Sequence, residues 1–385
     1  MASELSWDTK ETALVRTDDN WRRACTLLAT ADIRVGGGRP WDMRVHHPAT
    51  FDRILTRGSL GLGESYMDGW WDCDQVDELI TRILRARLDE RVGRAGWLWA
   101  SLKARLTNLQ SPHRAWQVGE EHYDLGNDLY EAMLDPSMAY SCGYWSAAQT
   151  LAQAQEAKLD LICQKLQLQP GMTLLDIGCG WGSLMLFAAQ HYRVQCVGLT
   201  VSKAQARQGA DKAGDLPIRF ELADYRQFNP QGEQRFDRIA SVGMFEHVGS
   251  AQLDDYFGRL QRLLKPGGLL LNHGITAGGI DNHQLGAGLG DFIEKHIFPG
   301  GELVHVSRVA RSLSGNGLEL LDAENLRPHY ARTLRAWSDA LESQIDRARE
   351  LTSEATVRAY RLYLAGCAVA FERGWISIHQ LLASR

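Results

Sequence analysis

The sequence predicts an α/β protein, with an open, mainly parallel sheet covered by helices on both faces and a smaller, mixed but mainly helical N-terminal domain in front of it. Three observations predict this. The chain has 385 residues, and because domains usually span roughly 100–200 residues, this length suggests two of them. From about residue 150, helical patterns alternate with short apolar strands, as in βαβ units. One of these strands runs directly into a glycine-rich turn and a helix.

The composition is that of an ordinary globular protein, with 44% hydrophobic and 23% charged residues and a net charge of −5. This balance excludes a disordered or collagen-like chain, and the net acidity argues against a nucleic-acid binder. No run approaches the roughly 18 apolar residues of a membrane span, and the N-terminus lacks the basic-then-apolar order of a signal peptide. We therefore expect a cytosolic protein.

The chain has seven cysteines, an odd number, and no two of them stand in C-x-x-C spacing. A disulfide framework or a zinc ribbon is therefore not expected. The sequence predicts no metal site.

The N-terminal domain is expected to hold short elements. Residues 18–30 place apolar side chains at helical spacing behind two aspartates, which predicts a capped amphipathic helix. The alternating run around the glycines at 36–38 predicts a small hairpin, and Pro48 suits the first turn of a further helix. The stretch 58–71 predicts a turn packed by Tyr66, Trp70 and Trp71. Residues 1–80 contain no set of side chains that looks catalytic.

A basic window follows this domain. From Arg82 to Arg114 there are eight Lys or Arg against two acids, a local net charge of +6, and Trp97 and Trp99 lie among them. Interleaved cations and aromatic rings at near-helical spacing suit an anionic lipid surface. A solvated linker helix would give the same pattern, and the window alone does not separate the two.

The second half predicts the alternating elements in a definite order, namely helix 150–166, strand 173–177, helix 183–191, strand 194–199, helix 202–213, strand 218–222, strand 236–242, helix 252–264 and strand 269–273. The glycine-rich residues 276–290 predict a loop long enough to serve as a lid or substrate gate. Helices and a final pair of strands are expected beyond it. No repeat of 20–50 residues is present, so a solenoid is excluded.

The glycine-rich turn follows the strand 173–177 and contains Gly178, Gly180 and Gly182, with Asp176 just before them. Glycine at the start of a helix lets the backbone approach a ligand closely. The spacing G-x-G-x-G differs from the dinucleotide fingerprint G-x-G-x-x-G, which disfavours an NAD fold. A tight turn without any ligand remains the alternative for this motif alone.

Three further features accompany the turn, and together they resemble class I S-adenosylmethionine-dependent methyltransferases. They are Ala223-Asp224-Tyr225 after the third strand, Gly243-Met244-Phe245-Glu246-His247 after the fourth, and Leu263-Leu264-Lys265-Pro266-Gly267-Gly268 before the fifth. The sequence departs from that superfamily at one point, because the usual acid at the end of the second strand is missing. Thr200 and Gln205 would have to take over its contact with the ribose.

Longer motifs make the resemblance narrower. The stretches 121–128, 139–145, 176–182, 243–249 and 58–71 stand in the order found in the cyclopropane-fatty-acyl-phospholipid synthases, so the resemblance covers nearly the whole chain. It implies a lipid-binding and dimerisation domain at 1–90, a basic linker at 91–118 and a catalytic domain at 119–385. It also implies a homodimer in the cytoplasm, bound peripherally to the inner face of the membrane, with a bilayer of unsaturated phospholipids as its partner.

The resemblance implies the chemistry as well. These enzymes transfer a methylene from S-adenosylmethionine to the cis double bond of an acyl chain in a phospholipid, through a carbocation that a bound bicarbonate deprotonates. Such a site needs a base near the cation and no competing water. By this resemblance, the residues that would bind bicarbonate are Cys142, Glu246, His273, Ile275 through its backbone N–H, and Tyr330. Glu246 would accept the O–H of the bicarbonate, since two bare negative charges repel each other.

The donor site implied by the resemblance is larger. It comprises Tyr140, Ser141, Gly178, Gly180, Gly182, Thr200, Gln205 and Tyr225, the last of which would stack near the adenine. Tyr123 would lie between the donor and the acyl chain, as a substrate contact. Aromatic rings at that junction could stabilise the passing cation.

Each assignment has an alternative. His247 could act in place of Glu246, His273 could cap a buried strand, and Tyr330 could be core. Cys367 matches a cysteine suspected as a nucleophile in the family, but its apolar neighbours favour a buried, inert thiol. For the whole protein, the alternatives are a fatty-acyl methyltransferase that leaves a methyl or methylene branch, or a non-catalytic lipid-binding module.

Overall fold

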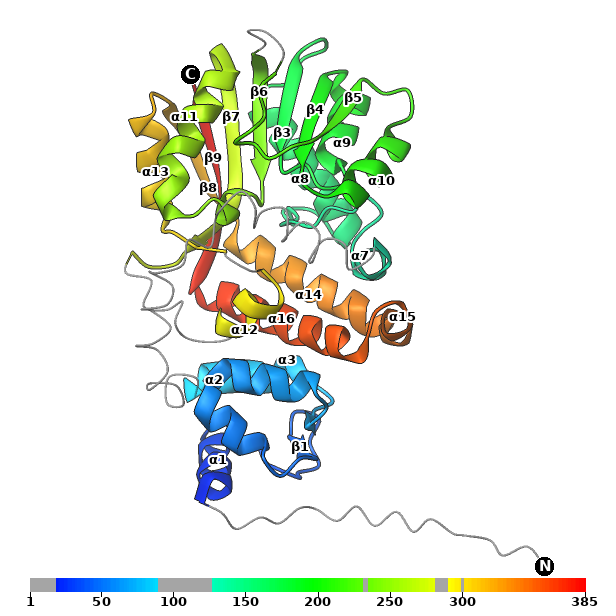
Figure 1. The fold of residues 1–385 in the computed structure, drawn as a ribbon, viewed down its shortest axis with the longest axis vertical. Coiled ribbons are helices and arrows are strands. Elements are labelled where there is room, and N and C mark those ends of the chain that lie inside the picture. The colour runs from blue at the N-terminus through cyan, green and yellow to red at the C-terminus, as the bar shows by residue number, and fades with distance from the viewer. Residues whose placement is uncertain (1–18, 89–126, 231–234, 281–289, 299–300) are drawn as a thin grey trace, which may run out of the picture.

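The computed structural model describes residues 19–88, 127–230, 235–280, 290–298 and 301–385 (Figure 1). Within these residues no helix combines the length and the apolar character needed to cross a bilayer. The described chain forms three layers, with the sheet at one end, long helices from the C-terminal part in the middle, and the N-terminal helices at the other end (Figure 1).

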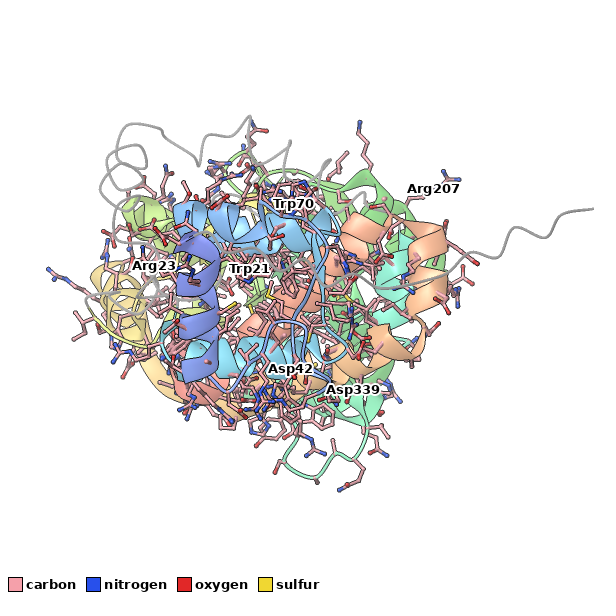
Figure 2. The ribbon with its side chains drawn as sticks, turned by 90° about the horizontal axis from the view of Figure 1, so that it is seen from below. Trp21, Arg23, Asp42, Trp70, Arg207 and Asp339 are labelled. Carbon is pink, nitrogen blue, oxygen red and sulfur yellow. The ribbon has the colours of Figure 1, made fainter. Side chains whose placement is uncertain are left out.

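The N-terminal layer is mainly helical, as predicted. It contains α1 (Asp19–Thr30), β1 (Arg44–Val45), α2 (Thr50–Met67), β2 (Trp71–Asp72) and α3 (Val76–Arg85). The helix predicted at 18–30 is confirmed, and Pro48 lies just before α2. Figure 2 shows this layer from below; in it Trp21 of α1 packs edge-on against Phe51 of α2, with ring centroids 4.9 Å apart.

The hairpin predicted around Gly36–Gly38 is wrong. Instead β1 pairs antiparallel with β2, far along the chain. The glycines belong to a compact loop around the buried carboxylate of Asp42, which accepts the N–H groups of Arg34 and Arg39 at 2.9 and 3.0 Å. A carboxylate that takes several donors holds a loop more firmly than a two-strand ladder of this length would.

The prediction for residues 58–71 was also wrong in part. Residues up to Met67 continue α2, and only the segment from Asp68 to Trp70 turns. Gly58 interrupts the helix, with φ 55° and ψ −131°, a conformation that favours glycine. Tyr66 and Trp71 are fully buried beside each other, as expected.

The sheet has seven strands in the order β5-β4-β3-β6-β7-β9-β8. The strands are β3 (Thr173–Ile177), β4 (Gln195–Thr200), β5 (Ile218–Leu222), β6 (Phe236–Val242), β7 (Leu264–Ala277), β8 (Glu319–Asn325) and β9 (Ile376–Ser384). Strands β3 to β7 run parallel, whereas β9 is antiparallel to both β7 and β8. The predicted parallel sheet and final strand pair are thus confirmed.

Helices cover the sheet and connect it to the N-terminal layer. They are α7 (Asn127–Met133), α8 (Leu151–Lys165), α9 (Ser183–Tyr192), α10 (Lys203–Ala213), α11 (Leu253–Leu263), α12 (Gly290–His296), α13 (Val306–Gly315), α14 (Arg327–Ser343), α15 (Ile345–Leu351) and α16 (Glu354–Arg373), with short 3-10 turns at Phe245–His247 and Ser250–Gln252. A capping box at Thr150 and Gln153 fixes the start of α8.

Four apolar clusters are present among the described residues, and the three largest hold these layers together. Two of them flank the sheet. The third is continuous from α1, α2 and α3 into α14 and α16, and it includes Tyr66, Trp71, Trp337 and Phe371. The N-terminal helices therefore share a core with helices that reach the sheet, which brings them close to the site described next.

Candidate active site

A cavity of about 430 Å³ opens at the carboxyl ends of the central strands, where open parallel sheets usually bind their ligands. Its polar end comes from the sheet side, with Glu246, His247 and His273. Its other walls are mainly apolar and come from α3, α12, α14, α16 and β9; they include Leu84, Ile293, Leu334, Phe371 and Ile378. Acidic side chains of α12, Asp291 and Glu294, also belong to the lining, but a mostly apolar cavity with few polar groups suits a long hydrocarbon chain with a reactive centre.

Glu246 lies in the 3-10 turn after β6 and is 7% exposed. Its Oε1 accepts the backbone N–H of Ile275 at 2.6 Å, while its buried Oε2 has no hydrogen-bond partner among the described residues. Burial raises the pKa of Glu246 to about 7, although the Ile275 N–H lowers it. The carboxylate is thus fixed by one oxygen and available through the other.

Ile275 was expected to offer its backbone N–H to the anion. In the structure that N–H bonds to Glu246, so its direct effect is to orient the carboxylate. Gly274, next to it, allows the close approach, since a Cβ there would stand 2.2 Å from the ring of Phe245 and 3.0 Å from Glu246 Oε1.

His273 lies in β7, opposite Gln380 of β9. The Gln380 amide nitrogen is 3.3 Å from His273 Nδ1, and because an amide nitrogen only donates, Nδ1 accepts and Nε2 carries the proton. Nε2 is buried and has no partner among the described residues. Burial lowers the pKa of His273 to about 3, so the ring is neutral at physiological pH and offers one N–H donor.

The other residues predicted as catalytic, Tyr330, Cys142 and Cys367, lie close to this end of the cavity. Tyr330 of α14 lines the cavity and packs on the ring of Phe371. Cys142 is fully buried, and its Sγ points to the carbonyls of Gly143 and Leu326, at 3.3 and 3.9 Å, behind the cavity lining. Cys367 of α16 does line the cavity, but burial raises the pKa of its thiol to about 12. A protonated thiol is a poor nucleophile, which agrees with the inert role favoured by the sequence.

Tyr140 and Ser141 form a segment that α8 holds in place. Gln155 donates to the carbonyls of Ala139 and Ser141, at 3.1 and 2.8 Å. Lys158, 2% exposed, donates to Ser141 Oγ at 3.0 Å, so that the hydroxyl proton of Ser141 is left to donate elsewhere. Both Tyr140 and Ser141 line the cavity. Sequence reasoning missed Gln155 and Lys158, whose spacing is also that of an ordinary helix face.

The predicted glycine turn has the backbone that a ligand loop needs. Gly178, Gly180 and Gly182 all have positive φ, at 78°, 55° and 82°. A Cβ at Gly182 would stand 2.5 Å from the ring of Phe220, so packing alone requires that glycine. A Cβ at Gly180 would meet no described atom within 4 Å, which leaves open space at the start of α9.

Thr200 and Gln205 come together at the end of β4. The Thr200 hydroxyl donates to Gln205 Oε1 at 3.0 Å, and both side chains are buried. Tyr225 lies further along, edge-on to Tyr256 with the Arg226 guanidinium 5.6 Å from its ring centre. Tyr123, the remaining predicted contact, lies outside the described residues.

Helix α12 forms one wall of the cavity; helices were expected in this part of the chain without stated bounds, and residues 281–289 of the predicted lid loop before it lie outside the described residues. Its Asp291, Ile293 and Glu294 face the cavity. From the other side, its Lys295 donates to Glu64 Oε1 of α2 at 2.6 Å. A Cβ on Gly63 would stand 2.1 Å from the ring of Phe292, so the two helices touch at a glycine.

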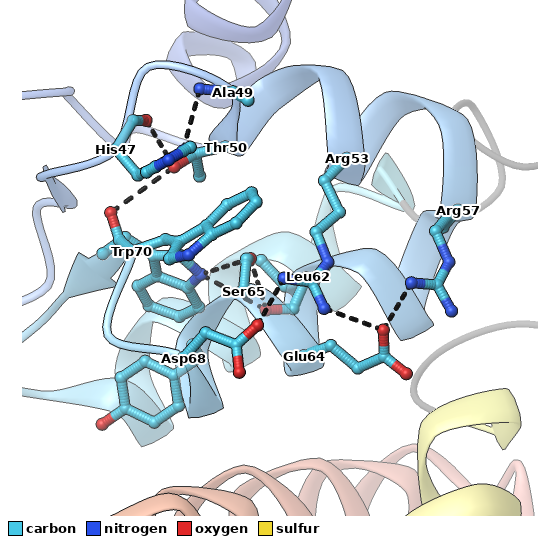
Figure 3. Close-up of polar contacts among 12 residues, drawn as sticks. His47, Ala49, Thr50, Arg53, Arg57, Leu62, Glu64, Ser65, Asp68 and Trp70 are labelled. Atoms are coloured by element: carbon cyan, nitrogen blue, oxygen red, sulfur yellow. Dashed lines mark hydrogen bonds and ion pairs between the residues drawn. The ribbon is translucent and has the colours of Figure 1, made fainter.

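Glu64 is the centre of this contact between layers. Its Oε2 accepts from Arg53 and Arg57 at 2.9 and 2.5 Å, as Figure 3 shows, while His296 lies 3.4 Å from Oε1. Burial would raise the pKa of Glu64, but the hydrogen bonds from Lys295, Arg53 and His296 outweigh it and lower the pKa to about 2. The N-terminal layer thus braces a wall of the cavity through one ionised carboxylate.

Known proteins resemble this chain closely. The mycolic acid cyclopropane synthetase family matches residues 110–381. The cyclopropane-fatty-acyl-phospholipid synthase of Escherichia coli strain K12 is 45% identical over 377 residues, covering 96% of this chain and 94% of that protein. A probable fatty acid methyltransferase of Pseudomonas putida is 49% identical over 267 residues, covering 68% of this chain and 67% of that protein.

Solved structures agree with the sequence matches. The crystal structure of mycolic acid cyclopropane synthase CmaA1 complexed with SAH and CTAB has a TM-score of 0.66 and 39% identity, covering 70% of this chain and 98% of that chain. This confirms the class I methyltransferase fold predicted from the sequence. The chain is an enzyme of the S-adenosylmethionine-dependent methyltransferase class, and it belongs to the mycolic acid cyclopropane synthetase family.

Proposed function

We propose that the chain is a cyclopropane-fatty-acyl-phospholipid synthase, which adds a methylene from S-adenosylmethionine across a cis double bond in phospholipid acyl chains. The observation that carries this proposal is the pairing, in one apolar cavity, of an acceptor and a donor without partners among the described residues, Glu246 Oε2 and His273 Nε2. An ion that both donates and accepts hydrogen bonds would satisfy both groups. Bicarbonate has that chemistry.

Three side chains of this chain would bind the bicarbonate ion. Glu246 Oε2 accepts its O–H, His273 Nε2–H donates to one of its oxygens, and the Tyr330 hydroxyl supplies a further contact. Bicarbonate, when bound, would supply the base that removes a proton from the newly added methyl group. The Ile275 N–H acts indirectly here, because it holds the Glu246 carboxylate. Cys142, on the segment next to Ser141, would keep that segment packed against α14.

The donor would lie over the glycine turn. Gly178 and Gly180 bring the backbone close to it, Gly182 starts α9, and Thr200 with Gln205 bind the ribose in place of the usual acid. Tyr140 and Ser141 would contact its sulfonium end, and Tyr225 would stack near its adenine. The open space at Gly180 supports this assignment, and Tyr123 keeps its proposed place between donor and acyl chain.

The apolar walls of the catalytic cavity would keep water away from the carbocation. Water would trap a cation, so the double bond must react in a place that excludes water. Phe371, Leu334 and Ile378 line the cavity without offering any nucleophile, and the Cys367 thiol beside them is protonated. The aromatic rings of Tyr140 and Tyr363 lie in the same lining and could stabilise positive charge.

A second function has support from one observation, the 49% identity to the P. putida protein named as a probable fatty acid methyltransferase. Such an enzyme would resolve the same cation to a methyl or methylene branch. The longer match to the E. coli synthase, over 96% of this chain, favours the ring. A non-catalytic lipid-binding module is disfavoured, since the polar groups of the site are all present.

We also propose how the enzyme reaches its substrate. Residues 1–90 would bind lipid and form the homodimer, residues 91–118 would be a basic linker, and residues 119–385 would catalyse, on the cytoplasmic face of the membrane. Most of the basic window lies outside the described residues. Its first member, Arg82, pairs with Asp32 and lies over the Trp41 ring, so it belongs to the fold. Neutralising Arg85, Arg87, Arg91 and Arg94 together should make vesicle binding weaker and less sensitive to salt.

Incubation with unsaturated phospholipid vesicles and methyl-labelled S-adenosylmethionine tests the main proposal. The product should gain one CH₂, lose its double bond and show ring protons by NMR; retention of a double bond in a branched product would instead establish the second function. Removal of dissolved bicarbonate should slow turnover, and its return should restore it. A turnover rate that does not change when bicarbonate is removed would contradict the proposal that bicarbonate is the bound ion.

The donor site has its own test. Gly180→Val would place a branched side chain in the open space above the turn and force it into a positive φ, so S-adenosylmethionine binding should be lost. Calorimetric titration measures it. Gly171→Val, which also has a positive φ and open space but lies before β3, is the matched control and should keep its affinity. Equal affinity of both variants would contradict the donor assignment.

A further inference from the structure

A second cavity lies within the N-terminal layer, between α1, α2 and α3. Its volume is about 80 Å³, and its lining is apolar except for Ser59 and the backbone of Gly58; the lining includes Ala24, Leu28, Phe51, Leu62, Ile83 and Leu84. An apolar cavity of about 150 Å³ can bind benzene, which has six carbons. On that scale, this cavity could hold about three carbons of a hydrocarbon chain.

The second cavity shares a wall with the catalytic cavity. Leu84, near the end of α3 and 3% exposed, lines both of them. In Figure 1, α3 lies on the side of α16 away from the sheet, whereas Glu246 and His273 belong to the sheet side. The catalytic cavity thus extends from its polar end at the sheet to Leu84, a residue whose side chain also belongs to the lining of the second cavity.

The interruption of α2 contributes to this cavity. Gly58, the residue with non-helical angles inside α2, lines it together with Ser59, the next residue. The N-terminal helices lie outside residues 110–381, so the family match assigns nothing to this cavity. A continuous α2 would place different side chains here, and the break is therefore part of how the cavity forms.

We propose that this second cavity receives the methyl end of the acyl chain whose double bond lies in the catalytic cavity. The inference rests on the proposed function. Leu84 would turn aside to let the chain pass, and the depth of the second cavity would limit how many carbons may follow the double bond. The occupant is a saturated hydrocarbon end, because the lining offers no charged group and a single hydroxyl. The N-terminal layer would thus select substrates by length.

Two variants test this proposal on phosphatidylglycerol vesicles. Two lipids are compared, with the cis double bond at the same distance from the carboxyl carbon. They differ only in the number of carbons beyond the double bond. Ala24→Leu fills the second cavity from α1. The ratio of long-tail to short-tail turnover should fall about tenfold, since a methylene group in a hydrophobic pocket changes specificity by that order. Ala29→Leu adds the same side chain at an exposed position of α1 and should leave the ratio unchanged. Leu84→Ala removes the common wall and should raise the ratio.

The outcomes separate this inference from the proposed function. If wild type converts neither lipid, the proposed function fails. If wild type converts both, and Ala24→Leu slows both by the same factor or changes neither, the proposed function stands and the second cavity is only a gap in packing. Thermal unfolding of Ala24→Leu checks that this variant folds. If it does not fold, the ratio of long-tail to short-tail turnover in Leu84→Ala is the test, and a ratio that does not rise would contradict the proposal.

Discussion

Two buried glutamates, one in each half of the molecule, meet opposite surroundings. Glu64, between the layers, is 8% exposed and receives hydrogen bonds from four basic side chains; Glu246, in the catalytic cavity, is 7% exposed and receives one, from a backbone N–H. The pKa falls to about 2 in the first case and rises to about 7 in the second. The exposed fractions are similar, but Glu246 is enclosed more deeply by protein and has fewer partners, and both differences separate the two pKa values.

This difference distinguishes a carboxylate that stabilises the fold from one that is available to bind a ligand. A carboxylate whose oxygens are both paired with cations is stable and has no capacity left for a ligand. A buried carboxylate with an unpartnered oxygen is unstable as an ion, and such groups gather at functional sites. Each of the following predictions alters one side of this comparison.

The largest effect is expected from Glu246→Gln. The amide can still accept the Ile275 N–H, but it presents N–H donors where the carboxylate would accept the O–H of the ion. We expect turnover to fall about 100- to 1000-fold, as for loss of one preorganised hydrogen bond at a reaction centre. Steady-state assays measure it, and donor affinity should stay within twofold. His247→Gln is the matched control, and a larger loss there would transfer the role to His247.

The pH dependence of wild-type turnover should follow the same carboxylate. Glu246 must be ionised to accept a proton donor, and its pKa is about 7. We therefore expect turnover to fall about tenfold per pH unit just below 7, more steeply at lower pH where bicarbonate is itself protonated, and to level off above 7. Neutral His273, with a pKa of about 3, adds no step in this range. A profile that is flat from pH 5 to 8 on well-folded enzyme would contradict the raised pKa.

The two halves also differ in how far the sequence predicts them. Strand 173–177 and the parallel sheet follow from apolar runs and glycine turns, which are local signals, and the motif residues around Glu246 and His273 follow from resemblance. The hairpin predicted around 36–38 is absent because the side chains of Asp42 and Arg39 organise the loop and because β1 pairs with β2, far along the chain. Tertiary contacts override such short alternating patterns.

The apolar walls of the cavity could not be predicted for a related reason. Tyr363, Cys367 and Phe371 lie on one face of α16 at helical spacing, which is also the pattern of a buried core helix. Only the packed structure distinguishes a face that covers a core from one that borders a cavity. Glu64 was missed similarly, because its partners on α12 lie far along the chain.

A smaller effect is expected from Glu64→Gln. The variant removes the charge that pairs with Arg57 and Lys295, while Arg53 keeps Asp68, and we expect about 1–3 kcal/mol less stability at pH 7, since these partners are partly solvated. Because its pKa is lowered, the Glu64 contribution is present above about pH 4.5 and is lost as the pH falls toward 2. Chemical denaturation measures it. Asp68→Asn, which removes the more exposed partner of Arg53 shown in Figure 3, should change stability by under about 1 kcal/mol.

The smallest effect, and the one that most sharpens the comparison, is a gain of stability in Glu246→Gln. The folded protein holds the Glu246 proton up to a pKa of about 7, whereas the unfolded chain releases it near 4.5. Between these values the folded state binds more protons, so the free energy of unfolding contributed by Glu246 falls as the pH rises, and the loss is complete above 7. Glutamine has no such loss, but its unpartnered amide N–H groups offset part of the benefit. We expect Glu246→Gln to be less stable than wild type near pH 4.5, where only this offset acts, and to be about 1 kcal/mol more stable at pH 8, the opposite of Glu64→Gln. Denaturation of both proteins at the two pH values measures this, and a Glu246→Gln variant less stable than wild type at pH 8 would show that Glu246, like Glu64, supports the fold.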